Sequence, residues 1–76
     1  MNYQLAMMAL EGLGRSPLRL TVDGSSITIE GSGASFKELA RLCLLLGGEA
    51  SEAGEEIELA PPIHLSGGVI RLKVSE

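Results

Sequence analysis

Residues 18–30 have the sequence LRLTVDGSSITIE, and this stretch decides the fold class. Apolar and polar residues alternate on both sides of its centre, the apolar ones being Leu18, Leu20, Val22, Ile27 and Ile29. A period of two is typical of a strand that buries one face. The central DGSS segment has the composition of a tight turn. The stretch therefore predicts a β-hairpin with one apolar face.

A helix is predicted ahead of the hairpin, from Tyr3 to about Leu13. Asn2 is a favourable N-cap, and Gly12 and Gly14 mark its end. The intervening residues are mostly strong helix formers, and almost all are apolar. Such a helix is buried on several sides, in its own fold or against a partner. A strand remains the alternative, because an alternating pattern is also formed by Tyr3, Leu5, Met7 and Ala9.

A second helix is predicted after the flexible segment of residues 31–34. Ser35 and Glu38 have the spacing of a capping box at a helix start, and the glycines at 47–48 end the helix. One broad face is predicted to be buried, and it consists of Phe36, Leu39, Ala40, Leu42, Cys43 and Leu46. Cys43 is accordingly interpreted as a core residue rather than a reactive thiol.

Two more strands are predicted near the C-terminus. Ile57 and Leu59 alternate with glutamates, and the prolines at 61–62 end that strand. Residues 63–65 are predicted to form a short extended piece. The last strand is predicted to follow, with Ile70, Leu72 and Val74 facing the core. If the two strands pair antiparallel, opposite charges face each other across the ladder, namely Glu56 and Glu58 against Lys73 and Arg71.

These elements give the order α-β-β-α-β-β in one domain that spans residues 1–76. The predicted class is α+β, with two layers: a four-stranded, mainly antiparallel sheet and two helices on one face. A chain this short buries only about 60% of its unfolded surface. One cysteine cannot form an internal disulfide, so self-association is the remaining way to add stability.

The charge pattern restricts the partners. The net charge is −4, and five of the ten acidic residues lie at 49–58, where there is no Lys or Arg. A chain without a basic cluster is unsuited to direct nucleic-acid binding. No apolar run approaches the roughly eighteen residues that a membrane span needs. The first residues lack signal-peptide features, so we expect a cytoplasmic protein that does not bind membranes.

Catalytic and cofactor-binding motifs are not evident. His64 and Cys43 are each the only residue of their type, too few for a closed zinc site. The Gly31-Ser32-Gly33 segment lacks the third glycine of a dinucleotide fingerprint and the lysine of a P-loop. We therefore expect no enzyme activity, no metal and no cofactor.

Several segments resemble the strand–helix–strand–strand layout of small bacterial toxin-immunity proteins. They are residues 27–31 (ITIEG), Leu39-Ala40, residues 57–59 (IEL) and residues 68–72 (GVIRL). The size, the acidity and the missing catalytic residues are similar to those of phage-encoded anti-CRISPR inhibitors. Both resemblances imply a stoichiometric inhibitor that covers a working surface of a larger protein, and neither assigns a role to a particular residue.

The leading hypothesis is therefore an anti-CRISPR-type inhibitor of a larger protein or nucleoprotein complex, with a toxin-immunity protein as an alternative. Its predicted partner-binding residues are Glu49, Glu52, Glu55, Glu56 and Leu45, the last because it stands on the polar side of its helix. A second alternative is a self-associating structural subunit, a homodimer held by the first helix through Leu5 and Met8.

Overall fold

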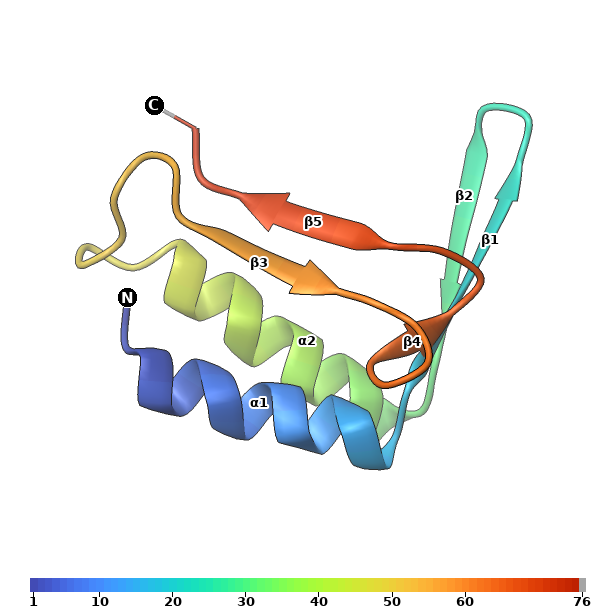
Figure 1. Ribbon diagram of the computed structural model, residues 1–76, viewed down its shortest axis with the longest axis horizontal. Helices are drawn as coiled ribbons and strands as arrows, with labels where there is room; N and C mark the ends of the chain where they lie inside the picture. The colour runs from blue at the N-terminus through green and yellow to red at the C-terminus, as the bar shows by residue number, and fades with distance from the viewer. Residues whose placement is uncertain (76) are drawn as a thin grey trace.

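The computed structural model describes residues 1–75 and confirms the α+β class (Figure 1). Its helices and strands are α1 (Tyr3–Arg15), β1 (Leu18–Asp23), β2 (Ser26–Glu30), α2 (Gly33–Leu46), β3 (Glu56–Leu59), β4 (Leu65–Ser66) and β5 (Ile70–Lys73). The observed order is thus α-β-β-α-β-β-β, with one short strand more than predicted.

The first helix is α1, and the strand alternative for this segment is wrong. The side chain of Asn2 accepts a hydrogen bond from the Leu5 N–H at 3.1 Å, so the predicted N-cap is confirmed. The helix continues past Gly12 and Gly14, because it packs closely against α2 at the first of these glycines. It ends where the Ser16 N–H donates to carbonyls of the last turn.

The predicted hairpin is confirmed as β1 and β2. Asp23 pairs with Ser26, which leaves Gly24 and Ser25 as a two-residue turn. Gly24 has φ +60°, a conformation that two-residue hairpin turns require at their centre. The hairpin rises from one end of the helical pair and its tip points away from the rest of the molecule (Figure 1).

The start of α2 differs from the prediction. The N-cap is Ser32, whose hydroxyl accepts a hydrogen bond from the Ser35 N–H at 3.1 Å. Ser35 is not a cap but a fully buried residue of the first turn. Its hydroxyl donates to the carbonyl of Ser16 at 2.7 Å, so it joins the end of α1 to the start of α2.

The single four-stranded sheet is wrong, because the strands form two separate sheets. One has the order β2-β1-β4 and the other consists of β3 and β5. Leu65 and Ser66, predicted as part of a plain extended piece and the following loop, form β4 and pair in parallel with Leu18 and Arg19 at the base of β1. The hairpin therefore finds its neighbour in β4, and β3 and β5 pair only with each other.

The predicted pairing of the last two long strands is confirmed. β3 and β5 run antiparallel, with Glu56 opposite Lys73 and Glu58 opposite Arg71. The Arg71 Nε donates to Glu58 Oε1 at 3.2 Å. The opposite face of this pair turns Ile57 inward to the core.

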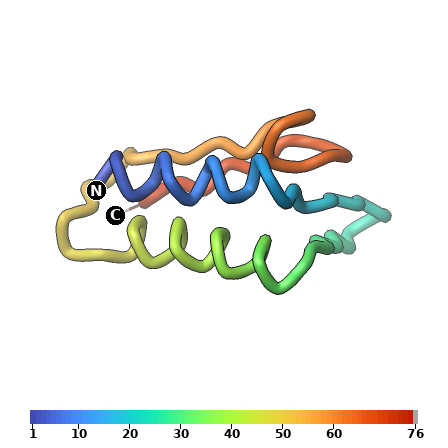
Figure 2. The backbone as a smooth tube through the Cα atoms, turned by 90° about the horizontal axis from the view of Figure 1, so that it is seen from below, coloured from blue at the N-terminus to red at the C-terminus, as the bar shows by residue number. Residues whose placement is uncertain are grey.

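The core lies between the helical pair and the β3–β5 pair and extends to the base of the hairpin. Figure 2 shows α1 and α2 side by side, running in opposite directions. The buried apolar residues are Ala6, Ala9, Leu13, Leu18, Leu20, Leu42, Ile57, Leu59 and Leu65. Within residues 1–75, neither helix has the length and apolar character needed to span a bilayer.

Candidate functional site

The acidic stretch lies in the connection between α2 and β3, at the end of the molecule where α1 begins (Figure 1). This connection, residues 47–55, is named the acidic loop here. It contains Glu49, Glu52 and Glu55 and no basic residue. Its conformation decides which carboxylates a partner could reach.

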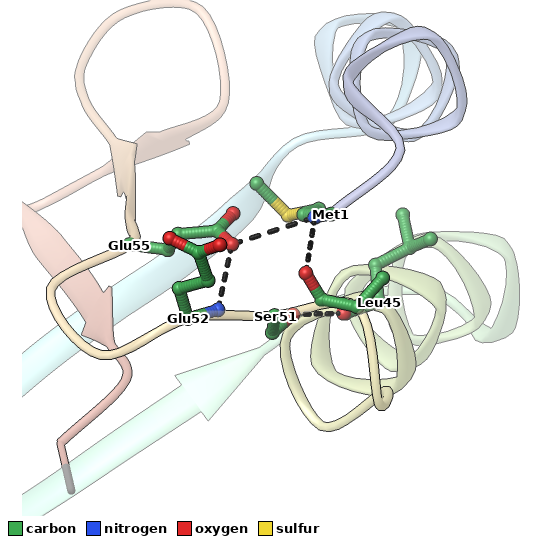
Figure 3. A network of polar contacts seen from close by, with 6 residues as sticks. Met1, Leu45, Ser51, Glu52 and Glu55 are labelled. Carbon is green, nitrogen blue, oxygen red and sulfur yellow. Dashed lines mark hydrogen bonds and ion pairs between the residues drawn. The ribbon is translucent and has the colours of Figure 1, made fainter.

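The side chain of Glu55 stabilises the acidic loop through contacts within the loop and with the N-terminus (Figure 3). Its Oε1 accepts a hydrogen bond from the Glu52 N–H at 2.8 Å and lies 3.4 Å from the amino group of Met1. That amino group also donates to the carbonyl of Ala50 at 3.0 Å. The backbone N–H of Glu52 is the main reason that the pKa of Glu55 is lowered; burial opposes this shift, and the Met1 amine reinforces it.

Further hydrogen bonds fix the two sides of the acidic loop. The Ser51 hydroxyl donates to the carbonyl of Leu45 at 2.7 Å, which ties the loop to the last turn of α2. The Gly54 N–H donates to the carbonyl of Val74 at 2.8 Å, and the Val74 N–H donates to the carbonyl of Glu55 at 2.9 Å. The loop is therefore held at α2, at the start of α1 and at the strand pair.

The structure separates the predicted partner-binding residues into two groups. Glu49, Glu52 and Glu56 are exposed, at or next to the acidic loop. Glu55 is only 13% exposed and its Oε1 bonds to the loop itself. Leu45 is half-buried and packs against the core, because the side of α2 that it shares with Glu38 faces α1.

An apolar groove lies beside this loop, between α1 and α2. It is open to solvent, has a volume of about 520 Å³, and is lined by Leu5, Met8, Ala9, Arg41, Leu44 and Leu45. Leu5 and Met8, the predicted self-association residues, are 49% and 59% exposed. Leu44 is 75% exposed, more than any other large apolar residue described. We call this surface the helical groove.

The sequence prediction overlooked Leu44. It lies within the run from Leu42 to Leu46, in which all five residues are apolar. A helix turns 100° per residue, so five successive side chains cannot all face one core. That run was the available signal that α2 has an apolar residue on its outer surface.

The predicted buried face of α2 is partly wrong. Cys43 is exposed, and Phe36 is 41% exposed. The inner face instead carries Ser35, Leu42 and the largely buried side chain of Glu38. Glu38 lies on this face because Gly12 of α1 leaves room for it.

The other candidate sites show ordinary structural roles. The Nδ1 of His64 accepts a weak hydrogen bond from the Ala60 N–H at 3.4 Å. A Cβ atom at Gly31 would lie 2.6 Å from a methyl group of Leu18, so this glycine permits close packing between the hairpin and α2. In the described part of the chain, no three His, Cys, Asp or Glu side chains gather as a metal site would require.

Comparison of the chain with protein-family models, with curated proteins and with solved structures finds no match. The functional argument therefore depends on the acidic loop and the helical groove alone.

Proposed function

We propose that this protein is a non-catalytic inhibitor that binds a basic surface of a larger protein or nucleoprotein complex through its acidic loop. A nucleic-acid-binding channel is the basic surface that fits best, as in the anti-CRISPR mechanism. The observation that carries the proposal is the combination of exposed Glu49 and Glu52 with a loop that is fixed at three places.

The charge distribution supports electrostatic docking. No Lys or Arg occurs between residues 42 and 70, so the attraction of this end for a basic surface is not cancelled by cations on the same segment. Complementary charges of this kind increase the rate of association and select the partner. A basic channel covered in this way would no longer admit its nucleic acid.

The fixed shape of the acidic loop supports tight binding. A loop that is already ordered loses little conformational freedom when the partner binds, so more of the interaction energy appears as affinity. Glu55 serves the partner indirectly in this mechanism, because it orders the segment that presents Glu52. The protein would act in the cytoplasm, where such complexes operate.

The test begins with an affinity capture from the host lysate, followed by binding measurements on the captured complex at several salt concentrations. The triple variant Glu49→Gln, Glu52→Gln, Glu56→Gln should bind at least about tenfold more weakly and show less salt dependence. Glu55 is left unchanged so that the loop keeps its shape.

A matched control loses the same charge elsewhere. The variant Glu11→Gln, Asp23→Asn, Glu30→Gln also removes three carboxylates and should retain most of the affinity. Equal loss in both variants, or no loss in the first, would reject docking through the acidic loop. A secreted or nuclease toxin as the captured protein would favour the toxin-immunity alternative, which uses the same kind of contact.

A further inference from the structure

Most of the first three turns of α1 buries small side chains and exposes larger apolar ones. Three of the four buried residues of α1 are small, namely Ala6, Ala9 and Gly12, and Leu13 is the one large side chain among them. Larger ones face outward, with Leu5 and Met8 about half or more exposed beside α2. Small residues let α1 approach α2 closely, while the outward residues bury little apolar area within the monomer. The pattern is that of a helix with a second packing partner.

The helical groove has both a concave and a convex part. Leu44 stands on the outer side of α2 at the rim of the same groove that it helps to line. A protruding leucine next to a cavity on one surface is the arrangement that two identical copies can use reciprocally. In a two-fold interface each copy contributes the same patch, so each protruding side chain enters the cavity of the other.

The charges around Leu44 are arranged in the same self-complementary way. Lys37 and Arg41, the latter paired with Glu38, precede it on the exposed side of α2, and Glu49 and Glu52 follow it in the acidic loop. A two-fold axis near Leu44 reverses this order in the second copy. The basic half of one chain then faces the acidic half of the other, and unlike charges stabilise the antiparallel register.

We propose that two copies of this chain associate through the helical groove, with their α2 helices antiparallel and each Leu44 inserted in the groove of the other copy. The resulting core is a four-helix arrangement of the two α1–α2 pairs. The pairing adds the buried apolar area that a 76-residue chain lacks. It uses Glu49 and Glu52, which the proposed function assigns to the partner, so dimerisation and partner binding would compete for the same carboxylates; the test below needs no partner.

The test is the molar mass of the purified full chain by sedimentation equilibrium, at concentrations up to about 1 mM. We expect twice the 8.0 kDa of one chain. Leu44→Glu and Met8→Glu should each raise the dissociation constant at least about tenfold, because each replaces an apolar contact of the interface by a charged carboxylate that must be desolvated. A wild-type chain that stays monomeric throughout would overturn the proposal.

Met7→Glu is the matched control. Met7 is 61% exposed and adjacent in sequence to Met8, yet it does not line the helical groove. It should leave the dimer intact, and far-UV circular dichroism should show that all three variants are folded. Dissociation by Met7→Glu but not by Leu44→Glu would overturn this interface.

Dilution of ¹⁵N-labelled protein gives an independent measurement that needs no variant. Amide resonances of Leu5, Met8 and Leu44 should shift as the dimer dissociates, and those of the hairpin tip at Gly24 should not. Shifts confined to the hairpin would also overturn the proposed interface.

Discussion

Gly12 of α1 lies directly under the carboxylate of Glu38 of α2, so that a Cβ atom at position 12 would come within 2.6 Å of Glu38 Oε2. The Glu38 side chain is 15% exposed, and Arg41 donates to its Oε1 at 2.6 Å. The ion pair stabilises a carboxylate that would otherwise be costly to desolvate. The missing side chain at Gly12 thus lets a charged residue occupy the helix–helix contact.

Gly12→Ala should destabilise the protein by about 1 kcal/mol. A helical alanine is favoured over glycine by up to about 1 kcal/mol, but overpacking costs roughly 1–3 kcal/mol. Gly14→Ala is the control, since its Cβ would meet only a methyl group of Ile63, at 3.7 Å. Gly14→Ala should therefore raise the free energy of unfolding in urea titrations.

The cause of the Gly12 effect can be isolated in a second background. With Glu38→Ala already present, Gly12→Ala should become stabilising, because the obstructing carboxylate is gone. A Gly12→Ala penalty that is the same in both backgrounds would contradict the contact with Glu38 as its source.

Gly67 and Gly54 should respond differently to alanine although their φ angles are +94° and +93°. Both variants place an L-residue in an unfavourable conformation, at a cost of about 1 kcal/mol or more. A Cβ at Gly67 would also overlap the carbonyl oxygen of Leu20, whereas no atom of residues 1–75 lies within 4 Å of one at Gly54. Thermal unfolding should show a larger loss for Gly67→Ala, and equal losses would be inconsistent with this close approach.

Ser35→Ala should lower the free energy of unfolding by about 1–2 kcal/mol. The substitution removes a buried hydroxyl and leaves the carbonyl of Ser16 without its donor. Ser25→Ala, in the exposed hairpin turn, is the control and should change stability by less than about 0.5 kcal/mol. Urea unfolding measures both free energies of unfolding. Equal losses for Ser35→Ala and Ser25→Ala would contradict the role of the Ser35 hydroxyl.

Glu55 should make stability depend on pH in the acidic range. Its pKa is lower in the folded chain than in the unfolded one, so its contribution is present at neutral pH and is lost as the pH falls through the folded value. Glu55→Gln should lower the melting temperature at neutral pH. It should also make the melting temperature fall less steeply as the pH is lowered. Glu49→Gln, which removes an exposed carboxylate of the same loop, should have a smaller effect on both.

Local patterns in the sequence predicted local structure well. The hairpin followed from alternation and turn composition, which act within a few residues of Gly24. The antiparallel pairing of Glu58 with Arg71 also followed, because cross-strand charge pairing leaves a readable pattern. In the site, Leu5 and Met8 were predicted to mediate self-association, which stays a prediction; the structure leaves both side chains exposed.

The incorrect predictions share one physical origin, which is packing between distant segments. Cys43 was assigned to the core by its place on the predicted apolar face of the second helix, but it is exposed, and Gly12 of the distant α1 makes room for Glu38 on the inner side of α2. The single sheet was wrong because Leu65 pairs with Leu18 across a long separation. The ion pair of Glu55 with the amino group of Met1 likewise joins two distant segments that no local pattern could connect.

The hairpin formed by β1 and β2 has a consequence for engineering. Its turn is exposed, and a Cβ atom added at Gly24 would have no atom of the described residues within 4 Å. The hairpin connects α1 and α2, which lie at its base, so lengthening the hairpin at its tip does not alter their packing (Figure 1). The turn at residues 24–25 is therefore a permissive place for inserting an epitope, a fluorophore or a whole foreign peptide while the remaining scaffold keeps its shape.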